Sequence, residues 1–204
     1  LLGRGNRWRF IKGECEKPRV ENRIFMLIDL RKSTGSAESL GHINYSRFIQ
    51  DCFYDLHVVQ GYGAEVYQYV GDEVVLSWRV RKNMDYTKCV KAFWAFEDRL
   101  VKRASFYQEK FGLVPTFKAG LHFGEVTTAE VGEIKKEIAY HGDTMNIAAR
   151  IQEKCNDFDR TLLISEFFYK ELSINSAFSL ELMGNDLLKG KQEVINIYAV
   201  NRGQ

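Results

Sequence analysis

The stretch YQYVGDEVVLSW (67–78) places two apolar, strand-like runs on either side of Gly71, Asp72 and Glu73. Two such runs joined by a short Gly-Asp segment predict a β-hairpin. The strands of this hairpin should be largely buried, and Asp72 should lie at its tip. Because Asp and Gly are also common turn residues for purely conformational reasons, a second acidic residue is needed to decide whether Asp72 has a chemical role.

That second acid lies at the end of another apolar run. RIFMLIDL (23–30) is short and almost entirely apolar, which is typical of a fully buried strand, and it ends in Asp29 and Leu30. The polar stretch RKSTGS (31–36) then interrupts the apolar pattern with small residues and a glycine. A helix is expected over 42–60, where apolar residues recur at helical spacing.

The remaining pattern completes a mixed fold. Further along the chain we expect a helix over 83–112, two strands within 116–132 joined by a turn at Gly124–Glu125, a strand and a helix over 137–155, and then a strand, a helix and two strands. The order β-α-β-β-α-β with extra C-terminal strands predicts an α+β fold, a ferredoxin-like or palm-type sheet with helices packed on it. In that topology the first strand lies beside the central hairpin, so Asp29 and Asp72 should converge.

Composition and charge suit one domain. The chain has 204 residues, of which 45% are hydrophobic, and this is enough for one core. Residues 1–20 carry six basic and two acidic side chains, a balance of +4, so the other 184 residues sum to −2 within the net charge of +2. Such a body lacks the basic field that a nucleic-acid-binding protein uses, and no nucleic-acid partner is expected. We divide the chain into a basic N-terminal segment (1–20) and a folded domain (21–204).

The cysteines and histidines do not suggest a metal site. There are four of each, and they are widely spaced without a C-x-x-C pair. A zinc site is therefore not expected, and cysteines of this kind are typical of small buried side chains in a reducing compartment.

Two carboxylates at adjacent strand ends suit a hard divalent cation. Mg²⁺ binds one or two protein carboxylates and completes its shell with water and phosphate oxygens. A pair of such ions about 4 Å apart can activate an attacking oxygen and stabilise a leaving phosphate. The turn after Asp29 contains Ser33 and Thr34, and its backbone N–H groups could hold a polyphosphate. The chain has no G-x-x-x-x-G-K-[ST] motif, which excludes a P-loop NTPase.

A third group of candidate residues lies in GDTMNIAAR (142–150). Asn146 and Arg150 are four residues apart, so they share a face of the predicted helix. An amide beside a guanidinium suits a sugar and a phosphate, although an exposed helix face with a solvated arginine also explains the pair. Lys189, in LLKGKQ (187–192), is a further candidate phosphate contact or simply a surface lysine.

Together these segments resemble the catalytic domain of the class III adenylate and guanylate cyclases. The resemblance extends from about residue 22 to about residue 200, in family order and spacing. The matching blocks are FMLIDLRKST (25–34), YQYVGDEVVLSW (67–78), AGLHFGEV (119–126), YHGDTMNIAARIQ (140–152) and LLKGKQEVINIYAV (187–200). The resemblance implies conversion of a nucleoside triphosphate into its 3′,5′-cyclic monophosphate and pyrophosphate.

The resemblance also implies a cofactor and its ligands. Asp29 and Asp72 match the two metal-binding aspartates of the family, and the Leu30 carbonyl would assist them. Two Mg²⁺ or Mn²⁺ ions would bind there, together with the triphosphate.

The other family positions imply a dimer. Asn146 matches the ribose-orienting asparagine, Arg150 the transition-state arginine and Lys189 the triphosphate-binding lysine. In the family the aspartates come from one chain and the Asn/Arg pair from its partner. We therefore expect a head-to-tail homodimer with two composite active sites.

The base that the enzyme selects is poorly encoded. Adenylate-selective members usually carry Lys three residues before the hairpin glycine, and Asp or Thr three residues before the glycine of HGD; guanylate-selective members tend to have Glu and Cys. Here these positions hold Gln68 and Ala139. A glutamine amide both donates and accepts, so it can pair with any base, and alanine offers no polar contact. ATP is expected mainly from the family, and a guanylate or pyrimidine cyclase remains an alternative.

Two other interpretations compete. VGDE (70–73) is similar to the turn motif of diguanylate cyclases, but it lacks the second Gly and the final Phe, and NIAAR (146–150) would then be unexplained. The second is a non-catalytic nucleotide-sensing module, which would bind a nucleotide without forming product.

The N-terminal segment suggests a location. Two leucines precede the basic stretch, and Lys and Arg commonly flank the cytoplasmic ends of membrane spans. We expect a membrane or sensory region upstream, with this domain on the cytoplasmic face. The alternative is a soluble protein with a basic N-terminal arm.

Overall fold

The computed structural model describes residues 17–133, 136–172, 178–187 and 194–203. In chain order its elements are β1 (Arg19–Leu30), α2 (Ser33–Asp55), the 3-10 helix η1 (Leu56–Tyr62), β2 (Glu65–Val70), β3 (Glu73–Arg79), α3 (Thr87–Lys102), α4 (Ala104–Phe111), β4 (Phe117–Val131), β5 (Glu137–His141), α5 (Thr144–Asp157), β6 (Leu162–Ser165), α6 (Glu166–Glu171), β7 (Phe178–Leu187) and β8 (Val194–Arg202). No helix among these described residues is long and apolar enough to cross a membrane.

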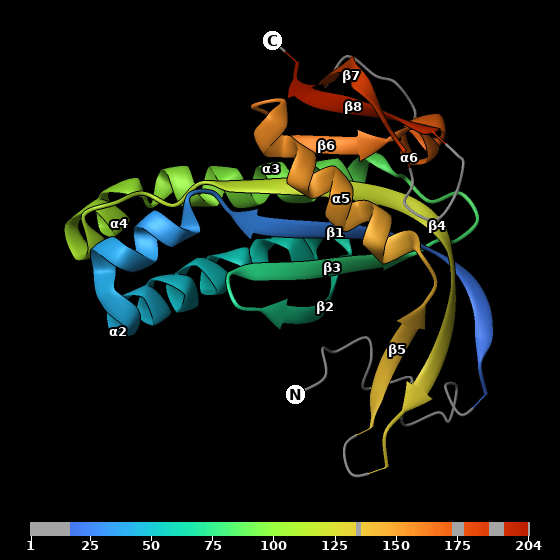
Figure 1. The fold of residues 1–204 in the computed structure, drawn as a ribbon, viewed down its shortest axis with the longest axis horizontal. Coiled ribbons are helices and arrows are strands. Elements are labelled where there is room, and N and C mark those ends of the chain that lie inside the picture. Colours follow the sequence, from blue (N-terminus) through green and yellow to red (C-terminus); the bar gives the residue numbers. More distant parts are fainter. Residues whose placement is uncertain (1–16, 134–135, 173–177, 188–193, 204) are drawn as a thin grey trace.

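The strands form one sheet in the order β2-β3-β1-β4-β6-β8-β7, with β5 paired to β4 (Figure 1). Only the β4–β6 pair is parallel; the other pairs are antiparallel. The predicted α+β fold is confirmed, since β1, α2, β2, β3, α3 and β4 follow the β-α-β-β-α-β order and further strands extend the sheet. The first strand lies directly beside the β2–β3 hairpin, as that topology requires.

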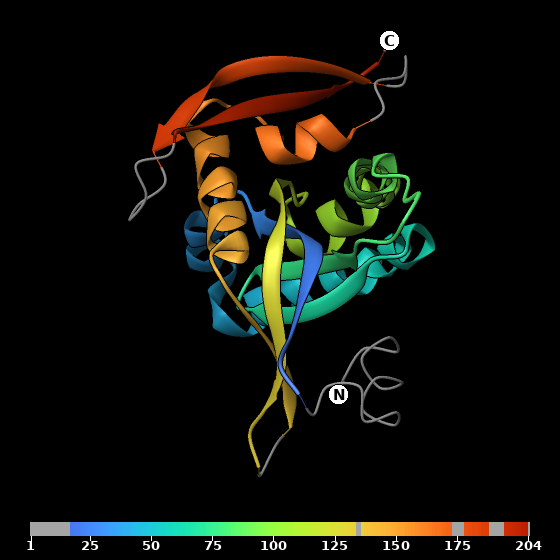
Figure 2. The same ribbon diagram turned by 90° about the vertical axis from the view of Figure 1, so that its right-hand side faces the viewer.

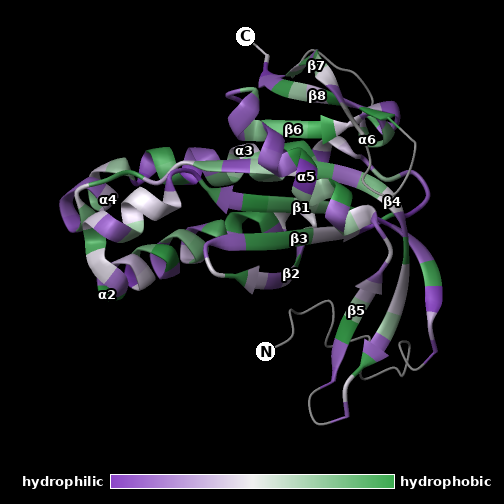
Figure 3. Ribbon diagram, viewed as in Figure 1, coloured by the Kyte–Doolittle hydropathy of each residue, from purple (hydrophilic) through white to green (hydrophobic). Residues whose placement is uncertain are grey.

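Strand β1 is apolar on both faces because helices cover both. Ile24, Met26 and Ile28 face a core that α2, α3 and α4 complete. Phe25 and Leu27 point the other way, into a smaller cluster that contains Ala148 of α5. This two-sided burial explains why RIFMLIDL shows no polar alternation. Figure 3 shows the resulting concentration of hydrophobic residues in the central strands.

Two predicted element boundaries are wrong. Helix α2 begins at Ser33 rather than at residue 42, and it contains a kink at Gly41, where φ is +71°. The predicted helix over 83–112 is divided at Arg103 into α3 and α4. In α2 the weak helix formers Ser33, Gly35 and Gly41 lie inside a helix that tertiary packing stabilises, whereas Lys102, Arg103 and Ala104 favour a helix and their local propensity does not explain the break.

The predicted turn at Gly124–Glu125 is also wrong, because β4 continues through both residues. A Cβ atom at Gly124 would lie 2.8 Å from the hydroxyl of Thr144. That hydroxyl donates a hydrogen bond of 2.6 Å to the Glu125 carbonyl. Gly124 therefore allows the start of α5 to approach the strand closely, which is a packing role rather than a turn role.

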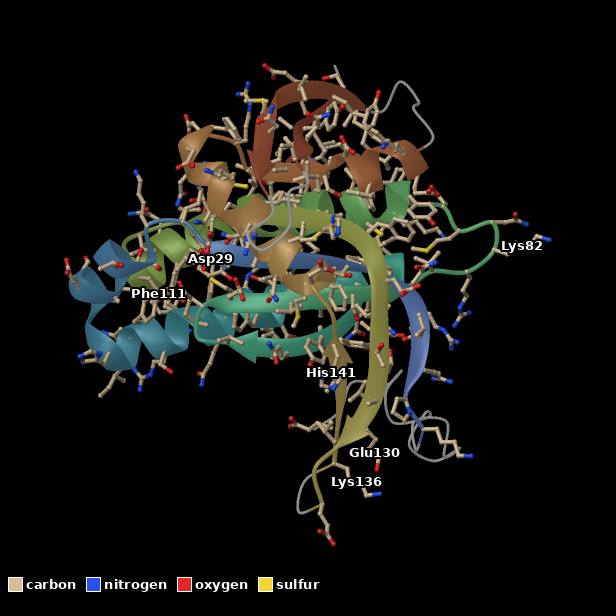
Figure 4. The ribbon with its side chains drawn as sticks, turned by 45° about the vertical axis from the view of Figure 1, so that its right-hand side comes forward. Asp29, Lys82, Phe111, Glu130, Lys136 and His141 are labelled. Atoms are coloured by element: carbon tan, nitrogen blue, oxygen red, sulfur yellow. The ribbon has the colours of Figure 1, made fainter. Side chains whose placement is uncertain are left out.

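The far half of β4 and the whole of β5 form an arm that projects from the body (Figure 2). Near its end the Nζ atom of Lys136 lies 2.7 Å from Oε1 of Glu130, and Figure 4 shows both residues there. The antiparallel β4–β5 register runs from Thr127 opposite His141 to Val131 opposite Glu137.

A buried carboxylate joins α2, α3 and α4, which cover the face of the sheet opposite α5. Asp55, at the end of α2, has no exposed surface. It accepts hydrogen bonds from Arg99 Nε at 2.9 Å, Arg103 Nη1 at 2.8 Å and Tyr107 Oη at 2.7 Å. These donors come from α3, from α4 and from Arg103 between them, so one side chain fixes the relative positions of all three helices.

We expect Asp55→Ala to lower the free energy of unfolding by about 3–5 kcal/mol. Removing one partner of a buried charge network leaves the others unsatisfied, and here the buried Tyr107 hydroxyl loses its acceptor. Asp51→Ala is the matched control, since its pair with Lys110 is solvent-exposed and should be worth less than about 1 kcal/mol. Urea unfolding measures both changes, and equal losses would contradict the role given to Asp55.

The same network makes stability depend on pH. Burial alone would raise the pKa of Asp55, but hydrogen bonds from Arg103, Tyr107 and Arg99 together hold that pKa below its ordinary value of 3.8. A carboxylate with a lowered pKa contributes stability above its unfolded-state pKa and loses that contribution as pH falls through the folded-state pKa. Below about pH 4 we expect wild-type stability to fall more steeply than that of Asp55→Asn. Parallel pH profiles from urea unfolding would contradict this.

Candidate functional site

The β2–β3 turn presents an acid at one edge of the sheet. Gly71 and Asp72 are the two turn residues between Val70 and Glu73, which pair across the hairpin. Gly71 has a φ of +61°. Two-residue hairpin turns need a positive φ, and glycine adopts it without strain. In the neighbouring pair, Asp29 of β1 lies opposite Glu73. The structure thus brings the two predicted metal ligands, Asp29 and Asp72, to the same place.

Asp29 is held by two buried side chains. Its Oδ2 atom lies 3.3 Å from Lys118 Nζ and accepts a 3.2 Å hydrogen bond from Gln152 Nε2. Lys118 and Gln152 are buried, whereas about a quarter of the Asp29 side chain (24%) remains exposed. Burial raises the pKa of Asp29, Lys118 opposes this shift, and the Asp72 carboxylate adds to it. Asp29 is therefore positioned through one oxygen.

Asp72 has a buried oxygen without a partner. Its Oδ2 atom is inaccessible to solvent and accepts no hydrogen bond from the described residues. The carboxylate also interacts with Tyr45 of α2, because burial, followed by the charge of Asp72 and a hydrogen bond to it, raises the pKa of Tyr45 to about 12. An unpartnered buried carboxylate oxygen beside a second carboxylate fits a bound cation.

Glu73 adds a third acid to this neighbourhood. Burial, and then the carboxylates of Asp29, Asp72 and Glu153, raise the pKa of Glu73 to about 7. Yet among the described residues no three His, Cys, Asp or Glu side chains are grouped so that they could hold a metal ion by themselves. The arrangement is a two-carboxylate site, which suits Mg²⁺ or Mn²⁺ that completes its coordination with water and phosphate oxygens.

The start of α2 lies next to these acids in the chain. Leu30 is the last residue of β1, pairs with Phe117 of β4, and buries its side chain. Ser33 and Thr34 occupy the first turn of α2, ahead of the first helical hydrogen bond, from Ser36 N to Lys32 O. Backbone N–H groups before that bond have no partner within the helix, so they are available to an anion.

The two candidate base-contacting residues flank a contact between β2 and β5. The rings of Tyr67 and Tyr140 pack with their centroids 4.9 Å apart. Gln68 follows Tyr67, at an irregularity in the β2–β3 register, and its side chain is exposed. Ala139 precedes Tyr140 and is partly exposed. Gln68 and Ala139 are thus each one residue along the chain from this ring contact.

Asn146 and Arg150 lie on the outer face of α5. Asn146 is exposed and Arg150 is partly exposed, whereas Ala148 and Gln152 are buried against the sheet. Residues two positions apart on a helix are rotated by about 200° about its axis. Asn146 and Arg150 therefore point away from the sheet that Ala148 and Gln152 face. Gln152 is the residue that contacts Asp29, and among the described residues no hydrogen bond or ion pair joins Asn146 or Arg150 to the two aspartates.

Two cavities in the described structure contain neither the two aspartates nor the Asn146–Arg150 pair. One, of about 430 Å³, is lined by residues of β4, β5 and α6 at the start of α5, and the other, of about 680 Å³, lies near α3. Lys189 lies outside the described residues.

The sequence pattern missed three neighbours of the aspartates. Lys118 is the one charged residue in the apolar stretch TFKAGLHF (116–123), and its position opposite Asp29 follows only from the β1–β4 register. For Gln152 the sequence pattern predicts only a place in a helix. For Glu73 it predicts a turn residue, although the position of Glu73 next to Asp72, at the start of a buried strand, is a signal for a carboxyl with an unusual environment.

Comparison with known sequences agrees with this geometry. A family model described as the adenylate and guanylate cyclase catalytic domain matches residues 17–202. Adenylate cyclase 2 of Rhizobium meliloti (strain 1021) is 30% identical over 204 residues, which are 100% of this chain and 56% of the relative. An adenylate cyclase of Anabaena cylindrica is 26% identical over 180 residues, 86% of this chain and 36% of the relative. The chain thus spans about half, or less, of the length of these relatives.

Solved structures share the fold. A bacterial light-regulated adenylyl cyclase superimposes with a TM-score of 0.82 at 18% identity, covering 100% of this chain and 59% of the other. The guanylate cyclase domain of RhGC from Catenaria anguillulae, in complex with GTP, gives 0.73 at 16% identity, covering 92% and 100%. The family match extends over most of the chain, and this chain therefore belongs to the adenylate and guanylate cyclase catalytic domain family.

Proposed function

We propose that this chain is a nucleotidyl cyclase that converts ATP into 3′,5′-cyclic AMP and pyrophosphate. The observation that carries the proposal is the pair Asp29 and Asp72, brought together by strand register, with one buried Asp72 oxygen that accepts no hydrogen bond from the described residues. Relatives also support the proposal, because the two sequences compared above are named adenylate cyclases.

Two Mg²⁺ or Mn²⁺ ions, when bound, would lower the pKa of the substrate 3′-hydroxyl and neutralise the triphosphate. Asp29, Asp72 and the Leu30 carbonyl would hold them. Lys118 keeps Asp29 in position through its contact with Oδ2 of that residue. The first turn of α2, at Ser33 and Thr34, offers N–H groups to the phosphates. The 3′-oxygen attacks the α-phosphorus in line, forming the new ester bond as the bond to pyrophosphate breaks.

We propose that the site is completed by a second copy of this chain. Asn146 would orient the ribose and Arg150 would stabilise negative charge that develops on the phosphoryl group. Both residues are presented on the outer face of α5, and among the described residues no hydrogen bond or ion pair joins them to the aspartates of their own chain. A head-to-tail homodimer would place each pair across from the aspartates of the partner and so create two sites. Lys189 is proposed as a further triphosphate contact.

The decisive experiment is incubation with each of the four nucleoside triphosphates, with Mg²⁺ or Mn²⁺, followed by mass spectrometry for cyclic products. The proposal expects cyclic AMP as the main product. A cyclic product of another base in excess would favour a guanylate or pyrimidine cyclase. Nucleotide binding without any cyclic product would favour a non-catalytic sensing module.

Gln68→Lys is expected to raise the preference for ATP over GTP. The present amide can adapt to either base, whereas a lysine matches the residue usual in adenylate-selective members. One charge-assisted hydrogen bond contributes about 1.5–3 kcal/mol, which corresponds to a change of about 10-fold or more in the kcat/KM ratio. Gln50→Lys, the same change on the exposed side of α2, is the control. An unchanged ratio would remove Gln68 from the base pocket.

We also propose that this domain faces the cytoplasm behind a membrane or sensory region, and that the basic segment 1–20 adjoins the membrane. The support is the charge of that segment, which suits anionic lipid headgroups. Fractionation of cells that express the full-length protein tests this, because recovery in the soluble fraction would contradict membrane attachment.

A further inference from the structure

A cavity of about 680 Å³ lies at the β1–α2 turn, which contributes Arg31 and Lys32 to its lining. It is enclosed by that turn, by α3, by the loop before β4 and by the loop between α5 and β6. Of the residues assigned to catalysis or substrate binding only Leu30 lines it. Its size is that of a typical small-molecule site.

The walls of this cavity are mostly apolar. Leu100 and Phe117 are buried at its base. At its rim, Val101 of α3 is 71% exposed and Val114 of the loop before β4 is 40% exposed. Two exposed valines from different elements thus face one hollow, and an apolar ligand would remove both from water.

One rim of the cavity is cationic and already binds a carboxylate. Arg31 Nη2 lies 2.7 Å from Oδ1 of Asp159, and both residues line the cavity. Arg31, with help from Arg160 and Lys32, lowers the pKa of Asp159. The Asp159 side chain is 88% exposed, and pairs this exposed contribute little to stability, so another carboxylate can replace it.

The second carboxyl that lines the cavity already has a cationic partner outside it. Glu97 lines the cavity, but its Oε2 atom accepts a hydrogen bond from Arg202 Nη2 at 3.4 Å. Lys32 also lines the cavity, is exposed, and forms no hydrogen bond or ion pair through its ammonium group with the described residues. Of the charged residues that line the cavity, Glu97 thus has a cationic partner outside it, and Arg31 and Lys32 remain for Asp159 or for a ligand.

We propose that this cavity is a second, non-catalytic ligand site for an amphipathic carboxylate with a compact apolar body, such as a medium-chain fatty acid. The carboxylate would take the place of Asp159 on Arg31. The apolar body would lie against Leu100, Val101 and Val114. This site is independent of the cyclase reaction.

Decanoate at sub-micellar concentration is the probe, and isothermal titration calorimetry on the purified chain measures its binding. We expect saturable binding of one decanoate per chain, at least about tenfold tighter than decanol, because the alcohol lacks the charged contact to Arg31. Arg31→Gln should remove this difference, whereas Arg47→Gln, on the exposed surface of α2, should preserve it. Equal affinity for acid and alcohol in the wild type would overturn the proposal.

Asp159 provides a sharper test, since its removal should improve binding. Asp159→Asn frees Arg31 and is expected to tighten decanoate binding by about threefold or more, corresponding to the loss of a weak exposed pair. Asp157→Asn, which removes an exposed carboxylate paired with Lys154, is the matched control and should leave the affinity unchanged. Weaker decanoate binding in Asp159→Asn would overturn the assignment of the carboxylate position.

The apolar part of the site is tested by filling it. Val101→Trp should reduce the affinity for both decanoate and decanol by about tenfold or more, while Val20→Trp, at an equally exposed valine outside the cavity, should change neither. Circular dichroism checks that both variants are folded. Unchanged affinity in folded Val101→Trp would contradict the proposed location.

Discussion

Asp72→Ala is expected to reduce the rate of nucleotide cyclisation by about 10³-fold or more while the thermal stability of the metal-free protein stays the same or rises. The loss follows because a metal-bound phosphoryl group gains several kcal/mol of transition-state stabilisation, and about 1.4 kcal/mol corresponds to tenfold in rate. Stability should not fall, because removing the carboxylate relieves its repulsion with Asp29 and Glu73, and this relief offsets the loss of its hydrogen bond from the partly exposed Tyr45.

Asp29→Ala is the informative contrast. It should abolish activity as well, but it also removes the partner of the buried Lys118 and Gln152, at a cost to folding of about 1–3 kcal/mol. Electron paramagnetic resonance of Mn²⁺, with a 3′-deoxynucleoside triphosphate that cannot cyclise, measures ion binding independently of turnover. Near-wild-type rates or unchanged Mn²⁺ binding in both variants would contradict the metal assignment, whereas equal stability losses would contradict the described support of Asp29.

Local patterns were sufficient for the hairpin and for the buried strands. The run before Gly71 and the run after Asp72 allow few structures other than a hairpin, because only a tight turn joins two apolar strands without polar residues between them. The β1 run is buried on both faces, and its lack of alternation was the correct signal. The convergence of Asp29 and Asp72 then followed from topology.

The failures have specific causes. Gly124 resembled a turn signal, but its missing side chain serves the approach of Thr144 on α5, a contact between residues far apart in the chain. The first turn of α2 contains Ser33 and Gly35, which have weak helix propensity, so its helical state depends on packing. Local sequence cannot encode either effect.

Sequence patterns do not reveal the neighbours of Asp29 and Asp72, for a related reason. Lys118 lies opposite Asp29 through the β1–β4 register, and Gln152 reaches it only because α5 packs closely on β4. That packing requires Gly120, where a Cβ atom would lie 2.6 Å from the Ala148 carbonyl. A sequence shows each of these residues, but three-dimensional contact is needed to give them a role.

Arg150→Ala is expected to reduce the cyclisation rate by about 10³-fold or more, by analogy with other arginines that stabilise charge during phosphoryl transfer. Folding should be unaffected, because the side chain is partly exposed and makes no hydrogen bond or ion pair with the described residues. The affinity for Mn²⁺ and the non-cyclising nucleotide should change much less than the rate. Lys154→Ala, which removes another partly exposed cation of α5, is the control and should retain activity.

Mixing the inactive Asp72→Ala and Arg150→Ala chains should restore activity to about a quarter of the wild-type level. In a head-to-tail dimer a mixed pair contains one site with both aspartates and an intact arginine, and one site that lacks both functions. Random exchange makes about half of the dimers mixed, with one intact site in each. If the aspartates and Arg150 acted within one chain, no combination of the variants would contain an intact site. Absence of recovery, once labelled subunits are shown to exchange, would therefore refute the composite site while leaving the metal assignment standing.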